Sequence, residues 1–218
     1  MQPEEIGRLI ATAILDRRLV PGRRLNELEL SRLLGASRSM IRFALVGLQH
    51  DGLVAFEANR GAFVAKPTLA DAHFLFEALA ANERAAVDIV LAAATPPSLE
   101  RLRGVHARQA KARARGRTRR SEQLAIDFHH ELVALTGNPL LVDAQRKLLL
   151  RYRVATAVFK TGLDDRELED PHGEILALLE SRSAAKLRRR VDQHWRLVIR
   201  GQASAAHDVA DLAEALRL

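Results

Sequence analysis

The sequence predicts a mainly α-helical protein, in which three helices and a β-hairpin precede an all-α antiparallel bundle of six to seven helices. Three observations predict this class. Apolar residues recur at helical spacing over most of the chain. Strand-like runs are confined to residues 53–65. The breaks between the later helical segments are short, which favours antiparallel neighbours.

Two helices are expected in the first 35 residues. The first covers about Glu4–Arg17, and Pro21-Gly22 breaks the chain after it. The second helix is expected to begin at Asn26, because Glu29 follows three residues later in a capping-box pattern, and to end at Gly35. The apolar positions in each helix fall on one face: Ile6, Leu9, Ile10, Ala13 and Ile14 in the first, and Leu28, Leu30, Leu33 and Leu34 in the second.

A third helix and a hairpin follow. Ser37 can cap a helix over about Arg38–His50. Two strand-like runs, Leu53–Glu57 and Ala62–Ala65, flank Ala58–Gly61, which has the chemistry of a hairpin turn. Helix, short turn, helix and hairpin in this order indicate a winged helix-turn-helix.

The rest of the chain shows helical patterns only. We expect a linker at Lys66-Pro67-Thr68, which divides the chain into a winged helix-turn-helix domain at residues 1–66 and an all-helical domain at residues 67–218. The expected helices of the second domain are about Leu69–Ala94, Pro97–Arg115, Glu122–Thr136, Leu140–Thr161, Pro171–Glu180, Ala184–Gly201 and Ala205–Leu216.

The third helix carries the residues expected to read DNA. In a winged helix-turn-helix, the second helix of the pair enters the major groove with its N-terminal residues on base edges. Arg38 and Arg42 are four apart and share a face, and arginine suits bidentate contact with guanine. The predicted DNA-binding residues are Ser37, Arg38, Ser39 and Arg42 on the helix, and Asn59, Arg60 and Gly61 at the hairpin tip.

Composition supports this interpretation. The net charge is +7, which suits a polyanionic partner. Lys111–Arg120 contributes six basic residues, and a solvated loop is favoured there over a second nucleic-acid site. The chain lacks cysteine, its first residues are no signal peptide, and its longest apolar run, Ile89–Ala94, is too short to span a bilayer. We therefore expect a cytoplasmic protein with no membrane partner.

Five segments of the first 65 residues follow one another in a specific order: Pro21–Glu27, Leu33–Arg38, Ile41–Leu45, Leu48–Val54 and Arg60–Val64. In this order they resemble the GntR family of regulators. The resemblance implies a DNA-binding transcriptional regulator, expected to be a repressor, that binds a double-stranded operator.

This resemblance also implies which residues touch the operator, namely Arg38, Ser39 and Arg42, with Arg60 and Gly61 at the wing. The chain departs from the family pattern at two places. The family usually has Thr-Pro-Val where this chain has Ser39-Met40-Ile41, and it often has Glu where Phe43 stands. These departures bear on operator preference and leave the fold intact.

A second set of residues recurs in the C-terminal part: Phe128-His129, Leu132, Gly137–Leu141, His172, Ile175-Leu176 and His194. Their order and spacing resemble the FCD type of GntR effector domain over about 150 residues. The resemblance implies a small-molecule effector, such as an organic or fatty acid, and a homodimer formed through the bundle. A homodimer would read a near-palindromic site.

Three histidines are the candidate metal ligands. His172 and His194 each lie 11 residues from Ser183, so in an antiparallel helical hairpin they stand at the same height. His129 lies in the middle of a further helix. Histidines from three helices can converge inside a bundle, and imidazole suits a divalent metal such as zinc or nickel.

The chain departs from this family too. Metal-binding members usually carry an Asp four residues before the first histidine, where this chain has Ala125; Asp127 points to a nearly opposite side of the helix. Two alternatives follow from this departure: a site that holds metal through three histidines, with open positions for water or effector, or a site that has lost its metal. The family often has an Arg a few residues before a Glu in the first helix of the domain, where this chain has Leu79 before Glu83.

Two other functions compete with this interpretation. A metal-dependent hydrolase, or another enzyme, could use three histidines to activate water. The sequence contains none of the nucleophile-elbow, HExxH, phosphate-loop or dinucleotide motifs that would support an enzyme. An architectural DNA-binding protein without a ligand would not need a bundle of about 150 residues.

Overall fold

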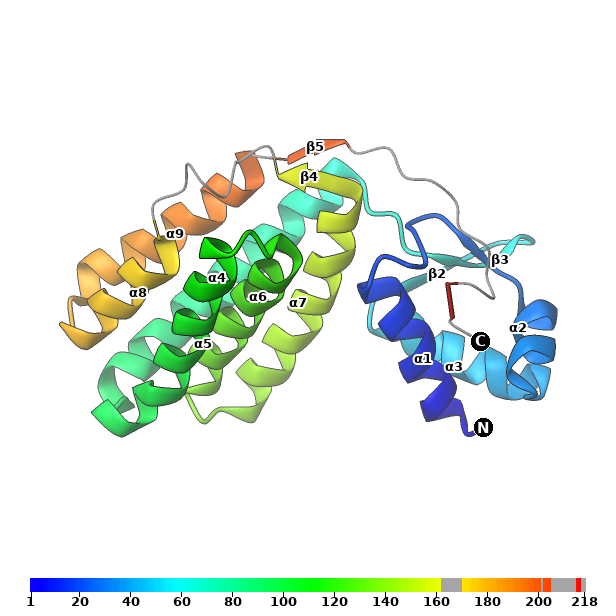
Figure 1. Cartoon of the computed structure of the whole chain (residues 1–218), viewed down its shortest axis with the longest axis horizontal. Coiled ribbons are helices and arrows are strands. Elements are labelled where there is room, and N and C mark those ends of the chain that lie inside the picture. Colours follow the sequence, from blue (N-terminus) through cyan, green and yellow to red (C-terminus); the bar gives the residue numbers. More distant parts are fainter. Residues whose placement is uncertain (162–169, 201, 205–214, 217–218) are drawn as a thin grey trace. The chain divides into compact units, whose positions relative to one another are not determined.

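The computed structural model describes residues 1–161, 170–200, 202–204 and 215–216. Most of them are helical, as the sequence predicts, and one small antiparallel sheet lies near the N-terminus (Figure 1). The chain forms two compact units, which are described separately: unit 1 holds Met1–Ala72, Leu150–Lys160 and Ala203–Leu218, and unit 2 holds His73–Leu149 and Thr161–Gln202. The predicted domain boundary at residue 66 stays a prediction.

Unit 1 contains the winged helix-turn-helix. Three helices and three strands form it: α1 (Pro3–Leu15), α2 (Glu27–Leu34), α3 (Arg38–His50), β1 (Arg24–Leu25), β2 (Val54–Glu57) and β3 (Gly61–Val64). The strands form one antiparallel sheet in the order β1-β3-β2, and β2 and β3 make the expected hairpin.

Local interactions set the ends of the two helices in the motif. The Asn26 side chain accepts hydrogen bonds from the backbone N–H groups of Leu28 (2.9 Å) and Glu29 (3.2 Å) at the start of α2. Gly35 ends α2 with φ 59°, a left-handed conformation that glycine adopts without strain. The Ser37 hydroxyl then accepts from Met40 N (3.3 Å) and begins α3. Both caps are those that the sequence predicts.

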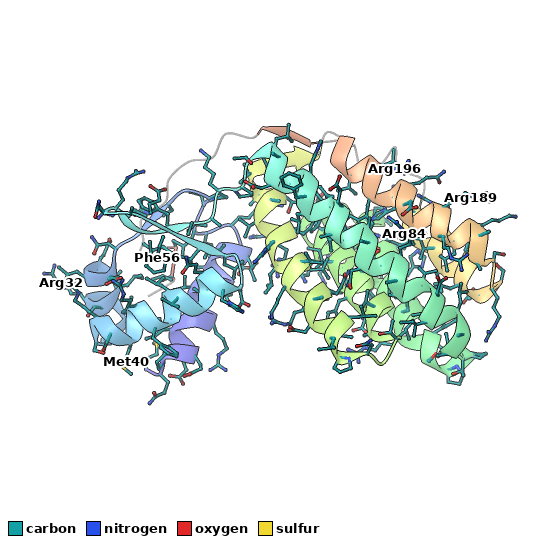
Figure 2. All side chains as sticks on the ribbon, turned by 180° about the vertical axis from the view of Figure 1, so that it is seen from behind. Arg32, Met40, Phe56, Arg84, Arg189 and Arg196 are labelled. Carbon is teal, nitrogen blue, oxygen red and sulfur yellow. The ribbon has the colours of Figure 1, made fainter. Side chains whose placement is uncertain are left out.

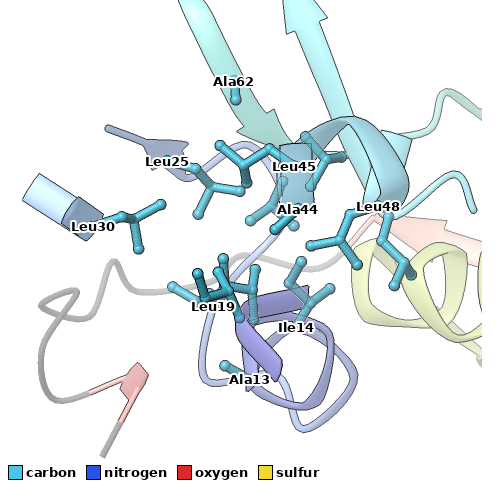
Figure 3. Packing of buried hydrophobic residues seen from close by; sticks show 14 of the residues in the cluster. Ala13, Ile14, Leu19, Leu25, Leu30, Ala44, Leu45, Leu48 and Ala62 are labelled. Atoms are coloured by element: carbon cyan, nitrogen blue, oxygen red, sulfur yellow. The ribbon is translucent and has the colours of Figure 1, made fainter. Parts of the chain in front are cut away.

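The core of unit 1 lies between α1, α3 and the sheet (Figure 3). Ile41, Leu45 and Leu48 of α3 are buried, as the helical spacing predicts. Two further parts of the chain join this cluster: Val154, from the C-terminal part of α7 (Pro139–Val158), and the buried pair Ala215-Leu216. The core leaves the opposite face of α3 exposed.

Unit 2 is the helical bundle. Its helices are α4 (Leu69–Ala93) from His73 onward, α5 (Pro96–Ala114), α6 (Thr118–Ala134), the N-terminal part of α7, α8 (Pro171–Glu180) and α9 (Ala184–Arg200). The helices α5 and α6 pack together as a hairpin, and so do α8 and α9. The basic run Lys111–Arg120 spans the turn between α5 and α6, and residues 114–120 are exposed there.

The structure corrects two details of the sequence prediction. The two-residue strand β1 is too short to produce a periodic pattern. Phe159–Thr161 forms the strand β4, which pairs with β5 (Gln202–Ser204), although the sequence places residues 159–161 at the end of a helix and shows no strand after Thr68. Aromatic and β-branched residues at that helix end favour the strand. Of the helix predicted over Ala205–Leu216, residues 205–214 lie outside the described residues.

No helix among the described residues is both long enough and apolar enough to cross a membrane.

Candidate functional site

The exposed face of α3 presents two arginines from its first two turns. The side chains of Arg38 and Arg42 are 67% and 65% exposed. Ser39 is also exposed, and its hydroxyl lies 2.9 Å from that of Ser37. Four of the predicted DNA-contacting residues therefore lie together at the start of one helix.

The Glu27 carboxylate on α2 lies between these arginines. Arg42 Nη1 donates to Glu27 Oε1 (3.3 Å), and Arg38 Nη2 lies 3.9 Å from Glu27 Oε2. The guanidinium of Arg42 also lies over the ring of Phe56 on β2, 5.9 Å from its centroid (Figure 2 shows Phe56). Two guanidinium groups are thus held side by side on one surface, an arrangement suited to an anionic partner.

The hairpin tip carries the remaining predicted residues. Asn59 has a φ of 59° and Gly61 a φ of 92°, so the turn depends on residues that tolerate positive φ. Arg60 is exposed; it pairs with Glu57 and lies over the ring of Phe63 at 5.1 Å. The tip therefore presents one cation. The assignment of these residues to DNA binding stays a prediction.

The three predicted histidines meet inside unit 2. They come from three helices, His129 from α6, His172 from α8 and His194 from α9, and all three are buried. One nitrogen from each lies within 4.8 Å of the others. The Nε2 atom of His129 is 3.1 Å from that of His172 and 2.9 Å from that of His194. Among the described residues, no carboxylate joins this group.

Hydrogen bonds on the far side of two rings determine which nitrogen carries the proton. His129 Nδ1 lies 2.9 Å from Glu83 Oε1 and 3.1 Å from Oε2, and His172 Nδ1 lies 2.8 Å from Gln109 Oε1. These oxygens accept, so the Nδ1 atom of each ring carries a proton. When both rings are neutral, their Nε2 lone pairs point toward each other.

Two lone pairs at 3.1 Å repel unless a cation lies between them. A divalent metal bound to the Nε2 atoms would satisfy this arrangement, and so would a proton held by His129. Three imidazoles with oriented rings match the chemistry of a zinc or nickel site, in which each ligating histidine donates its other N–H to a fixed acceptor. The residues present therefore fit a metal ion.

Glu83 of α4 is the buried centre of the supporting network. It is 0% exposed, and besides His129 it accepts from Gln145 Nε2 (2.7 Å) and Trp195 Nε1 (2.9 Å). Asn82 Nδ2 donates to Gln145 Oε1 (2.8 Å), which turns the Gln145 amide nitrogen toward Glu83. A buried carboxylate with this many donors is fixed in place, and it fixes the His129 ring in turn.

Ion pairs and a cap hold the helices that supply the histidines. Arg84 (Figure 2) and Asp88 of α4 pair with Asp192 and Arg188 of α9, at 2.9 Å and 2.6 Å. Two residues before His172, Asp170 caps α8 by accepting from Gly173 N (3.0 Å). The other oxygen of Asp170 lies 2.6 Å from Nε2 of His106 on α5. The metal-ligand candidates therefore lie on helices with several fixed neighbours.

Ala125 lies one helical turn before His129, is half-buried and offers no ligand atom. Asp127 accepts from Gln123 Nε2 (2.9 Å) on its own helix. Within the part of the chain that the structure describes, histidines alone are therefore available for metal binding at this site.

Burial lowers the pKa of His172 and of His194 well below the ordinary 6.5, and the nearby charges of His129 and Arg190 act in the same direction. Both rings are consequently neutral near pH 7, the form that binds a metal.

These lowered pKa values predict a pH-dependent stability of the metal-free protein. The unfolded chain takes up protons on both histidines as the pH falls through about 6.5, whereas the folded chain does not until lower pH. We therefore expect the urea midpoint, measured with a chelator present, to be flat above pH 7 and to fall below pH 6.5. A His172→Gln, His194→Gln variant should show a smaller fall. An equal fall in both proteins would contradict the lowered pKa values of His172 and His194.

The sequence pattern singles out none of Glu83, Gln109, Gln145 and Trp195 as a functional residue. A usable signal exists for Glu83 alone. It is a charged residue at helical spacing between the buried Leu79, Val87 and Val90, and a charge on an apolar face requires a partner. Gln109 and Gln145 come from helices whose pairing the sequence leaves open.

Comparison with known proteins matches both parts of the chain. The model described as "Bacterial regulatory proteins, gntR family" matches residues 2–64, and the FCD domain model matches residues 74–197. The Nta operon transcriptional regulator of Aminobacter aminovorans is 35% identical over 138 residues, which cover 62% of this chain and 64% of that protein. An HTH-type transcriptional regulator in an unstable DNA locus of Streptomyces ambofaciens is 32% identical over 161 residues, covering 67% of this chain and 65% of that protein. Each match thus spans less than two thirds of the relative's length.

Solved structures share the fold. A GntR transcriptional regulator from Rhodococcus sp. RHA1 superposes with a TM-score of 0.77 at 22% identity, covering 91% of this chain and 95% of that one. The E. coli protein McbR/YncC superposes with a TM-score of 0.72 at 17% identity, covering 91% and 97%.

Proposed function

The chain belongs to the GntR family of bacterial regulatory proteins and carries an FCD domain, and we propose that it is a DNA-binding transcriptional regulator controlled by a small molecule. One observation carries the DNA-binding part: Arg38 and Arg42 lie exposed and side by side at the start of α3, the second helix of the helix-turn-helix.

The proposed DNA interface consists of the α3 start and the wing. Arg38 and Arg42 contact base edges in the major groove, and Ser39 lies on the same exposed surface. Arg60 reaches a phosphate or the minor groove from the wing, where Asn59 and Gly61 shape the turn. Ser37 acts mainly as the cap of α3, since its hydroxyl already accepts from Met40 N.

The proposed sensor is the histidine cluster of unit 2. His129, His172 and His194 would hold a divalent metal, zinc or nickel, through their Nε2 atoms. When bound, this metal would supply a positive centre for an anionic effector, such as an organic acid. Arg190 lowers the pKa of both His172 and His194 and is itself paired with Glu174.

The helix α7 contains residues that contact the histidine network and residues that contact α1. In unit 2, Gln145 of α7 donates to Glu83 of the histidine network. In unit 1, Arg153 of the same helix donates to the backbone oxygen of Leu15 at the end of α1 (3.2 Å). The helix α7 therefore contributes residues to both units.

We further propose that the protein acts as a homodimer, because one winged module contacts few bases and two-fold symmetry doubles the sequence that is read. Release of DNA by the effector would make it a repressor. Since its target is the bacterial chromosome, it would act in the cytoplasm. No catalytic role is proposed, because the relatives are named as regulators and the three histidines are engaged with one another in a buried cluster.

Selection from a random-sequence duplex library tests this function. The full chain should enrich a near-palindromic sequence with two half-sites, and native mass spectrometry should give two chains per duplex. The same spectra of the gently purified protein would reveal bound metal and any co-purified metabolite. Absence of any enriched sequence, or a one-to-one complex of a monomer, would contradict the proposal.

A further inference from the structure

The exposed face of α3 carries two large apolar side chains beside its arginines. Phe43 is 66% exposed and Val46 is 49% exposed, although Ile41, Leu45 and Leu48 of the same helix are buried. Packing within unit 1 therefore does not account for either residue, since both point away from the core. A single exposed apolar residue is ordinary, but a pair on the proposed recognition surface calls for a partner.

The helical repeat puts these residues in register with the proposed base-reading positions. Phe43 lies one turn beyond Ser39, and Val46 lies one turn beyond both Arg42 and Phe43. Together these residues form a single exposed strip along α3: Ser39, Arg42, Phe43 and Val46. Its polar and cationic end would read the first bases of a half-site, and its apolar end would meet the bases that follow in the groove.

The charge around this strip favours DNA over another protein. From Arg38 to His50, α3 contains no acidic residue, and the nearby cations are Arg38 and Arg42, which share the single carboxylate of Glu27 on α2. An apolar patch bordered by guanidinium groups fits a surface that is anionic at its edges and has apolar groups on its floor. The major groove of DNA has this composition wherever thymines occur, because the thymine C5-methyl group is the apolar group on its base edges.

We propose that Phe43, together with Val46, contacts thymine methyl groups in the major groove and thereby selects A·T pairs within each operator half-site. The proposal rests on the proposed function, in which α3 enters the groove. It assigns the two kinds of readout to different residues: Arg38 and Arg42 read polar base edges, and Phe43 reads a methyl group. Phe43 is thus a specificity-determining residue.

Deletion of single methyl groups from the DNA tests the contact directly. The probe is the duplex enriched by the wild-type chain, compared with versions in which one thymine per strand is replaced by deoxyuridine, at fixed salt. We expect one symmetry-related pair of positions at which loss of the methyl groups weakens wild-type binding by about fourfold for each group removed. In Phe43→Ala, where Val46 alone remains at the contact, the same replacement should lose most of its effect, and in Phe43→Leu it should keep a larger part of it.

Phe74 provides a matched control, because it is 68% exposed on α4, outside the helix-turn-helix. Phe74→Ala should keep the wild-type ratio of thymine to deoxyuridine affinity. The inference is overturned if no position responds to methyl loss in the wild type, or if Phe43→Ala retains the full response. Failure of the wild type to enrich any duplex would instead contradict the proposed function and with it this contact.

Discussion

A His172→Ala, His194→Ala double variant is expected to lose divalent-metal affinity by about 100-fold or more relative to the wild-type chain. Loss of a single outer hydrogen-bond partner already costs metal sites about 10- to 100-fold, and this variant removes two of three direct ligands. Titration of Zn²⁺ and Ni²⁺ into chelator-treated protein, by calorimetry or a competing dye, measures the effect.

A His50→Ala, His73→Ala variant is the matched control, because it removes two exposed histidines outside the cluster. It should bind metal as the wild type does, and circular dichroism should show the same helical content in all three proteins. Equal metal affinity in the cluster variant and the control would contradict metal binding by the three histidines. A shared proton on His129 would then satisfy the facing nitrogens.

Two single substitutions should move metal affinity in opposite directions. Glu83→Gln weakens the acceptor that orients His129, so a decrease of about 10- to 100-fold is expected. Ala125→Asp returns a carboxylate one turn before His129, so tighter binding is expected. A change in the same direction for both variants would indicate a general structural effect.

Replacement of Arg38 or Arg42 by Ala is expected to weaken binding to the selected duplex by about 5- to 150-fold each, the value of one bidentate base contact. The loss should be smaller on a scrambled duplex, because a base contact contributes only when the correct base is present. Fluorescence anisotropy with both duplexes, at one salt concentration, measures the difference.

Arg189→Ala is the matched control for charge, since Arg189 is exposed on α9 (Figure 2). It removes one positive charge from unit 2 and should leave the ratio of selected to scrambled affinity unchanged. Unchanged affinity for the selected duplex in both Arg38→Ala and Arg42→Ala would contradict their assignment to base reading. An equal loss on both duplexes would assign them to phosphates.

The sequence predicts α3 almost completely, because the interactions that determine this helix are local. The Ser37 cap, the left-handed Gly35 and the buried Ile41 and Leu45 are all within a few residues of one another. Helical spacing alone then identifies which face of α3 is exposed. The pairing of Arg38 and Arg42 with Glu27 is less local, since it depends on how α2 crosses α3.

The histidine cluster is predicted only in part. Equal spacing from Ser183 places His172 and His194 at one height, and the structure brings their rings together with His129. The partners that orient the rings could not be predicted, because Glu83, Gln109 and Gln145 come from three other helices. Their proximity follows from the packing of the bundle, which neither the sequence spacing nor the composition predicts.

Specific DNA recognition is the central claim, and the ratio of two dissociation constants tests it most directly. The full chain is titrated against the selected duplex and against a duplex of the same composition in scrambled order, at physiological salt. We predict a ratio of about 1000 or more, the range of sequence-specific DNA-binding proteins. Equal affinity for both duplexes, with the same steep salt dependence, would mean that the cationic face of α3 binds phosphates alone, and it would contradict the claim.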